Sequence, residues 1–119
     1  MAEVSETLRA EIKRYQDLVE RLRVLAINRQ QIQSQLSELN DALRELGSLK
    51  EDAPIYKIVG SIMIHRQKDV VIKELNDLKE MLEIRLKALE KQEGLLKEQL
   101  EELEKKLVKR VGSAQTGAG

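Results

Sequence analysis

The sequence contains few residues that could form a catalytic or metal-binding site. It has a single histidine, His65, and no cysteine, so disulfides, thiolate metal sites and cysteine nucleophiles are excluded. No pair of carboxylates lies near His65 in the sequence, and we interpret it as a packed or surface histidine rather than a ligand or a base. There is no glycine-rich phosphate-binding pattern. These observations predict a protein that is not an enzyme and has no cofactor.

The charged residues indicate a helical protein without a nucleic-acid partner. The chain has 21 basic and 21 acidic residues, whereas a protein that binds nucleic acid usually has a basic excess. Charged residues make up 35% of the 119 residues, and there is no Phe, no Trp and only two Tyr. This composition is typical of long helices or coiled coils, because a compact round core is usually built around aromatic side chains.

No segment of the sequence predicts export or membrane insertion. The residues after Met1 lack the basic and apolar stretches of a signal peptide, and no run approaches the ~20 apolar residues that span a bilayer. The absence of cysteine fits a reducing compartment. We therefore expect a single cytoplasmic domain over residues 1–112, with no membrane partner.

Apolar residues recur at alternating spacings of three and four over residues 4–46, the heptad pattern of a coiled coil. Two polar residues, Glu11 and Arg29, interrupt the pattern. Gly47 follows where a left-handed C-terminal cap is expected, so the first helix should end at residue 46. The apolar seam comprises Val4, Leu8, Tyr15, Leu18, Leu22, Leu25, Ile32, Leu36, Leu39, Leu43 and Leu46.

A second heptad pattern predicts a helix over residues 69–111. Leu78, Leu82 and Leu86 are each four residues apart, which indicates a stutter that locally relaxes the supercoil. Gly112 should end this helix, and we expect the small, uncharged tail at residues 113–119 to be disordered. The seam comprises Val71, Leu75, Leu78, Leu82, Leu86, Leu89, Glu93, Leu96, Leu100, Leu103 and Leu107.

Residues 54–66, between the two helices, predict a β-hairpin. Two β-branched runs bracket Gly60 and Ser61, the signal of a tight type I′ or II′ turn. Pairing Val59 with Ile62 makes both faces largely apolar and leaves both edges open. Such a hairpin is marginal alone in water, and joining several hairpins into a shared sheet or closed barrel would remove the edges. We therefore expect an obligate oligomer joined through Ile55, Tyr56, Ile58, Val59, Ile62, Met63 and Ile64.

The two predicted helices have nearly the same length, about 65 Å at 1.5 Å per residue. If the hairpin reverses the chain, each seam becomes the partner of the other. The predicted fold is mainly α, a long antiparallel two-helix coiled coil with a central β-hairpin that joins an oligomeric β-barrel. This register pairs Leu36 with Leu82 and places Arg29 near Glu93. We hypothesise that an ion pair between Arg29 and Glu93 sets the register.

The central and C-terminal segments resemble a known family. The chain runs from a helix through the segment Pro54-Ile-Tyr-Lys-Ile-Val-Gly60 and a second strand to another helix. This order resembles that of the β-type subunits of prefoldin, an archaeal and eukaryotic co-chaperone. The segment Leu86-Lys-Ala-Leu-Glu-Lys-Gln-Glu93 is also similar to that family, and the resemblance covers nearly the whole chain. One departure is Gln67, where a small capping residue is expected before the second helix. Asp69 is the alternative cap.

The resemblance implies a hexamer of two α-type and four β-type subunits, in which hairpins form a double β-barrel and coiled coils surround a cavity. It implies an ATP-independent holdase that captures unfolded polypeptides at its coiled-coil tips and delivers them to a group II chaperonin. The alternative is a structural coiled coil or an adaptor that binds one specific partner. A mere linker between helices should, however, be polar rather than β-branched and apolar.

The helix ends are the predicted binding sites for unfolded polypeptides. The last turns of an antiparallel coiled coil fray, and partly exposed apolar side chains there can cover apolar stretches of a non-native chain. These side chains are Val4, Leu8, Ile12, Leu103, Leu107, Val108 and Val111. They could instead only close the seam, and for Leu103 and Leu107 both interpretations stay open.

Lys105, Lys106, Lys109 and Arg110 form a basic cluster near the end of the second helix. Cations suit a helix C-terminus because they meet the negative end of the helix dipole, and this explanation is sufficient by itself. The resemblance implies a further role, an electrostatic contact with an acidic patch on the chaperonin.

Overall fold

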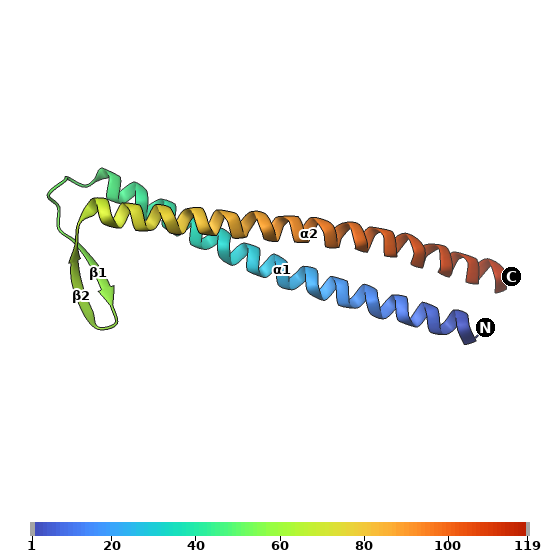
Figure 1. Ribbon diagram of the computed structural model, residues 1–119. Helices are drawn as coiled ribbons and strands as arrows, with labels where there is room; N and C mark the ends of the chain where they lie inside the picture. Colours follow the sequence, from blue (N-terminus) through green and yellow to red (C-terminus); the bar gives the residue numbers. More distant parts are fainter. Residues whose placement is uncertain (1, 119) are drawn as a thin grey trace. The chain divides into compact units, whose positions relative to one another are not determined.

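The computed structural model describes the backbone of residues 2–118 and the side chains of residues 6–112. Over these residues the chain forms α1 (Ala2–Ser48), β1 (Ile55–Val59), β2 (Ile62–Arg66) and α2 (Lys68–Ala118), in that order (Figure 1). The predicted arrangement of two long helices with an antiparallel hairpin between them is confirmed.

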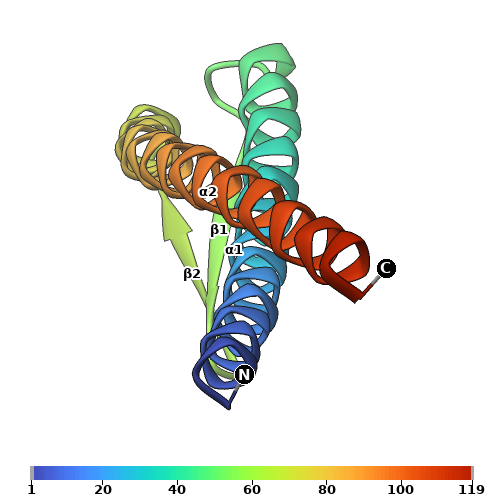
Figure 2. The ribbon, with the colours of Figure 1, turned by 90° about the vertical axis from the view of Figure 1, so that its right-hand side faces the viewer.

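The chain divides into two compact units, which we name by their contents. The terminal unit comprises Met1–Arg29 and Ala88–Gly119, and the hairpin unit comprises Gln30–Lys87. In the terminal unit the first turns of α1 and the last turns of α2 lie at the same end, which faces the viewer in Figure 2. The two helix segments of this unit therefore run antiparallel.

Each unit has its own small leucine core between α1 and α2. In the terminal unit Leu18, Leu100 and Leu103 are buried, with Tyr15, Leu22, Leu96 and Leu107 packed against them. In the hairpin unit the buried residues are Leu36, Leu39 and Leu82, flanked by Ile32, Leu43, Leu75 and Leu86. Leu36 and Leu82 share a cluster, as the predicted register requires.

The burial of α1 follows the predicted seam, whereas α2 departs from it at one place. Every predicted seam residue of α1 from Leu8 to Leu46 is buried or half-buried. On α2, Leu78 is 41% exposed and Lys79 is half-buried. With half-buried Ile72 in the seam, positions 72, 75, 79, 82 and 86 alternate spacings of three and four, so the burial pattern shows no stutter at Leu78–Leu86. The aliphatic stem of a lysine can cover apolar surface while its ammonium reaches water, which a count of apolar residues misses.

The glycines near the helix ends do not form the predicted caps. Among the described residues only Gly60 has a positive φ, so Gly47 lies inside α1 without a left-handed conformation. The hydroxyl of Ser48 instead donates to the carbonyl of Glu45, at 2.8 Å. α2 continues through Gly112 to Ala118. A helical glycine costs about 1 kcal/mol relative to alanine but does not by itself end a helix. The disorder expected for residues 113–119 stays a prediction.

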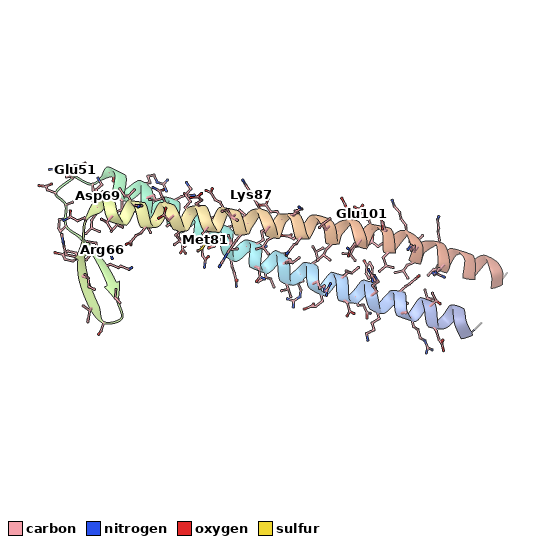
Figure 3. The ribbon with its side chains drawn as sticks, in the orientation of Figure 1. Glu51, Arg66, Asp69, Met81, Lys87 and Glu101 are labelled. Carbon is pink, nitrogen blue, oxygen red and sulfur yellow. The ribbon has the colours of Figure 1, made fainter. Side chains whose placement is uncertain are left out.

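The start of α2 combines two capping contacts. The carbonyl of Gln67 accepts a bond from the amide of Val71 at 3.1 Å, which makes Gln67 the N-cap residue. Asp69, in the first turn, accepts a bond from the amide of Val70 at 3.0 Å and lies at the positive end of the helix dipole. Figure 3 labels Arg66 and Asp69 on either side of the junction between β2 and α2. Here Arg66 pairs with Glu74, and Lys68 donates to the carbonyl of Leu49 at 2.8 Å.

Candidate functional site

The hairpin has the register that the sequence predicted. Val59 lies opposite Ile62, and the pairing continues to Ile55 opposite Arg66. Gly60 has a φ of +61°, and no described residue other than glycine has a positive φ. A type I′ turn needs a positive φ at both central residues, so the Gly60–Ser61 turn is type II′.

Both faces of the hairpin present large apolar side chains to solvent. One face carries Val59, Ile62 and Ile64, and the other carries Tyr56, Ile58 and Met63, all of them exposed. Ile58 has the largest exposed fraction of these, at 71%, whereas Ile55 is half-buried. Contiguous exposed apolar surface of this kind marks an interaction site in a protein.

His65 lies on the hairpin and packs against an aromatic ring. Its imidazole meets the ring of Tyr56 edge to face, with centroids 5.6 Å apart. This places it as the surface histidine that the sequence indicated. Within the described part of the chain, no cluster of three His, Cys, Asp or Glu residues is arranged to hold a metal ion.

The predicted tip residues differ widely in exposure. Val108 is 71% exposed, and Ile12 and Val111 are also exposed. Leu8 and Leu107 are half-buried, and Leu103 is only 7% exposed because it belongs to the leucine core of the terminal unit. Leu103 thus closes the seam in this structure. The side chain of Val4 lies outside the described residues.

The basic cluster lies more than two turns before the end of α2. Lys105, Lys106 and Lys109 are exposed, and α2 extends to Ala118 with no basic residue in its last turn. The dipole effect falls off within the last turn, so it does not explain the cluster. Arg110 differs from the three lysines because its guanidinium forms an ion pair across the seam.

Among the described side chains of the terminal unit, two ion pairs join α1 to α2. Arg29 Nε and Glu93 Oε1 lie 2.6 Å apart, and Glu93 is only 5% exposed. The pair that the sequence predicted therefore exists. The second pair joins Glu11 Oε2 to Arg110 Nε at 2.8 Å. Sequence reasoning missed it, although the register that pairs Arg29 with Glu93 also places Glu11 opposite Arg110.

A tyrosine makes a further cross-helix contact in the same unit. The hydroxyl of Tyr15 donates to Glu104 Oε1 at 2.8 Å. The hydrogen bond and the negative charge of Glu104 raise the pKa of Tyr15. On the surface of α1, the hydrogen bond from Arg23 lowers the pKa of Glu20. These contacts hold and orient helices, and none of them forms a nucleophile–base pair.

Comparison with known proteins identifies the family. A family model described as "Prefoldin subunit" matches residues 9–114. The chain belongs to the prefoldin family. It is 42% identical over 100 residues to the prefoldin subunit beta of Saccharolobus islandicus strain L.S.2.15, covering 84% of this chain and 79% of that protein. It is 36% identical to the prefoldin subunit beta of Pyrobaculum calidifontis, covering 98% and 94% of the two chains.

Solved prefoldin structures have the same fold. The prefoldin beta subunit from Thermococcus strain KS-1 superposes with a TM-score of 0.81 and 36% identity, over 85% of this chain and 89% of that one. Prefoldins are chaperones, and their β-type subunits are the relatives that this chain resembles throughout. Over the described residues, neither helix of this prefoldin subunit has an apolar stretch sufficient to cross a membrane.

Proposed function

We propose that this chain is a subunit of an ATP-independent holdase that works in the cytoplasm. It assembles with an α-type prefoldin subunit into a hetero-hexamer, captures unfolded polypeptides at its coiled-coil tip, and delivers them to a group II chaperonin. The observation that supports this most directly is the set of exposed apolar side chains on the hairpin and near the helix ends.

Assembly through the hairpin follows from its exposed surfaces. β1 and β2 pair only with each other in the described part of the chain, so each strand has one open edge. A two-stranded hairpin of this kind is marginally stable in water. Edge-to-edge pairing with hairpins of other subunits would satisfy the open backbone groups and bury Ile58 and Met63 in a barrel.

Client capture uses the exposed apolar residues near the helix ends. Ile12, Val108 and Val111 project from the helices without a packed neighbour that buries them. A non-native chain exposes apolar segments of variable sequence, and several weak contacts from several subunits would add to a useful affinity by multivalency. Leu8 and Leu107 can contribute when the helix ends separate, whereas Leu103 contributes mainly to the core.

Contact with the chaperonin uses the basic cluster. Lys105, Lys106 and Lys109 are exposed and carry no assigned role in the coiled coil. They suit an acidic partner surface. We expect charge reversal at these three lysines to weaken chaperonin binding, and added salt to weaken the binding of the unmodified subunit, because exposed charge contacts are screened.

The decisive experiment compares two variants at exposed apolar positions in the reassembled hexamer. The tip variant replaces Val108 and Val111 by serine, and the control replaces Ile84, which is 63% exposed on α2 in the hairpin unit, by serine. We expect the tip variant to lose suppression of aggregation for two unrelated denatured proteins, while the control retains it. Native mass must be unchanged in both. Full activity of the tip variant would contradict the proposed client site.

A further inference from the structure

Two polar contacts join α1 to α2 close to the ends of the helices. Glu11 pairs with Arg110, and one turn further from the ends Tyr15 donates its hydrogen bond to Glu104. We call these four residues the tip clasp. Within residues 6–112, the Glu11–Arg110 contact is the outermost ion pair between the two helices.

The Glu11–Arg110 pair is enclosed at the contact itself and open to water on the arginine side. The side chain of Glu11 is 17% exposed and that of Arg110 is 40% exposed, while the two atoms in contact, Oε2 and Nε, are themselves buried. They lie 2.8 Å apart without the alignment of a hydrogen bond. The contact is therefore mainly an attraction between charges, less screened by salt than a surface pair but still opposed by the cost of desolvating both groups.

The position of the pair relative to its apolar neighbours is informative. Glu11 occupies a seam position of α1, between Leu8 and Tyr15, and Arg110 follows Leu107 at the seam position of α2. Leu8 and Leu107 are half-buried. A pair of leucines at this level would close the seam more firmly than a charged pair that loses part of its hydration. The free energy needed to separate the helix ends at the clasp is therefore modest.

We propose that the tip clasp controls how much apolar seam the tip offers to a non-native polypeptide. This inference rests on the proposed function, and it assigns Glu11 and Arg110 as positioning residues that do not themselves contact the client. When the clasp is closed, only outward-facing side chains such as Val108 are available. When it opens, the helix ends separate and the half-buried side chains of Leu8 and Leu107 join the binding surface.

The test uses three variants in the reassembled hexamer, without chaperonin. Glu11→Gln removes one charge at nearly constant shape, Arg110→Glu places two carboxylates opposite each other, and Glu11→Arg/Arg110→Glu restores an inverted pair. We expect each single variant to bind a denatured model protein more tightly, by about fivefold, the ratio equivalent to one weak ion pair. The double variant should return toward the unmodified value.

Hydrogen exchange supplies a readout that does not depend on clients. Amides near Leu8 and Leu107 should exchange faster in the single variants and return toward the unmodified rate in the double variant. Added sodium chloride should raise client affinity of the unmodified protein more than that of Glu11→Gln, because only the former has an ion pair to screen.

Three outcomes would overturn the inference. Faster exchange with unchanged client affinity would show that opening the tip does not expose binding surface. Unchanged exchange in both single variants would show that the pair does not hold the ends. Lower affinity without recovery in the double variant would make Glu11 or Arg110 a direct contact. Failure of the unmodified hexamer to bind any denatured protein would instead refute the proposed function itself.

Discussion

At the scale of single residues, the charged side chains in the seam determine the register of α1 against α2. A leucine seam alone tolerates several alignments of α1 on α2, because each shift by a heptad restores the same pattern. Arg29 with Glu93, and Glu11 with Arg110, match in one antiparallel register. A misaligned pair of helices would leave these groups buried without partners, which is costly.

At the buried pair Arg29–Glu93, removing one partner should therefore cost more stability than replacing both. Glu93→Ala should lower the free energy of unfolding by about 2–3 kcal/mol, at the low end for buried pairs because Arg29 keeps some contact with water. Replacing both Arg29 and Glu93 by leucine should restore stability to the unmodified level or above it. Urea unfolding at one fixed subunit concentration measures both.

The exposed Arg23–Glu20 pair is the matched control, since both of its side chains are 60% exposed. Glu20→Ala should change stability by no more than about 0.5 kcal/mol. If the leucine double variant proved as unstable as Glu93→Ala, the buried pair would be contributing net stability rather than register.

Tyr15 gives a prediction about pH. Its phenol donates to Glu104, which raises its pKa in the folded protein above the usual value near 10. The stabilisation is therefore complete below the unfolded pKa and is lost as pH rises through the higher folded pKa. Tyr15→Phe should therefore have a lower Tm than the unmodified protein at neutral pH, and thermal unfolding should show that this difference in Tm shrinks in that alkaline range.

The pKa itself can be read from phenolate absorbance in a Tyr56→Phe background, where Tyr15 is the only tyrosine. Adding Glu104→Gln should lower the titration midpoint, because it removes the negative charge and weakens the hydrogen bond to the neutral phenol. A midpoint that did not move would mean that Tyr15 and Glu104 are not in contact in solution.

At the scale of elements, the sequence predicted the features that depend on periodicity and missed some that depend on how a side chain packs or which conformation a backbone adopts. Alternation of three and four identified the α1 seam from Leu8 to Leu46, and the Gly60–Ser61 pair identified the turn. The seam position of Lys79 was not predicted, because its aliphatic stem packs against the seam while its ammonium group stays in water. Gly47 was misjudged because a cap depends on backbone conformation, which residue type alone does not determine.

An added methyl group should have opposite effects on stability at two glycines, one in a helix and one in the hairpin turn. Gly94 lies inside α2, and a Cβ placed there would have no heavy atom within 4 Å. Gly94→Ala should therefore raise the free energy of unfolding by about 1 kcal/mol, the difference in helix propensity. Gly60 has equally open surroundings but a φ of +61°, so Gly60→Ala should cost about 1–2 kcal/mol and weaken the hairpin.

Chemical denaturation of the two variants in parallel measures this contrast. The added methyl group is the same in both, and neither site is crowded, so only backbone conformation distinguishes them. Equal effects of the two substitutions would mean that the turn at Gly60 is not type II′ in the assembled protein.

At the scale of the whole molecule, the hairpin must behave differently from the helices when it is exposed to water. Each helix has all its interior backbone groups bonded within itself, whereas β1 and β2 each keep one unpaired edge. The apolar seams of the two helices pack against each other within the chain. The apolar faces of the hairpin do not, and Ile58 and Met63 stay exposed among the described residues. Assembly should therefore depend on the hairpin alone.

Ile58→Asp tests this dependence, with Ile84→Asp as a control of similar exposure on α2. A carboxylate at Ile58 would have to be buried in the barrel that we propose, at a cost of several kcal/mol, so we expect the variant to dissociate to smaller species while its helical circular dichroism is largely retained. The control should keep its native mass, because its added charge stays in water. If Ile58→Asp still assembled with the α-type subunit to full mass, subunits would have to associate through surfaces of the helices, and the exposed apolar hairpin would need a different partner.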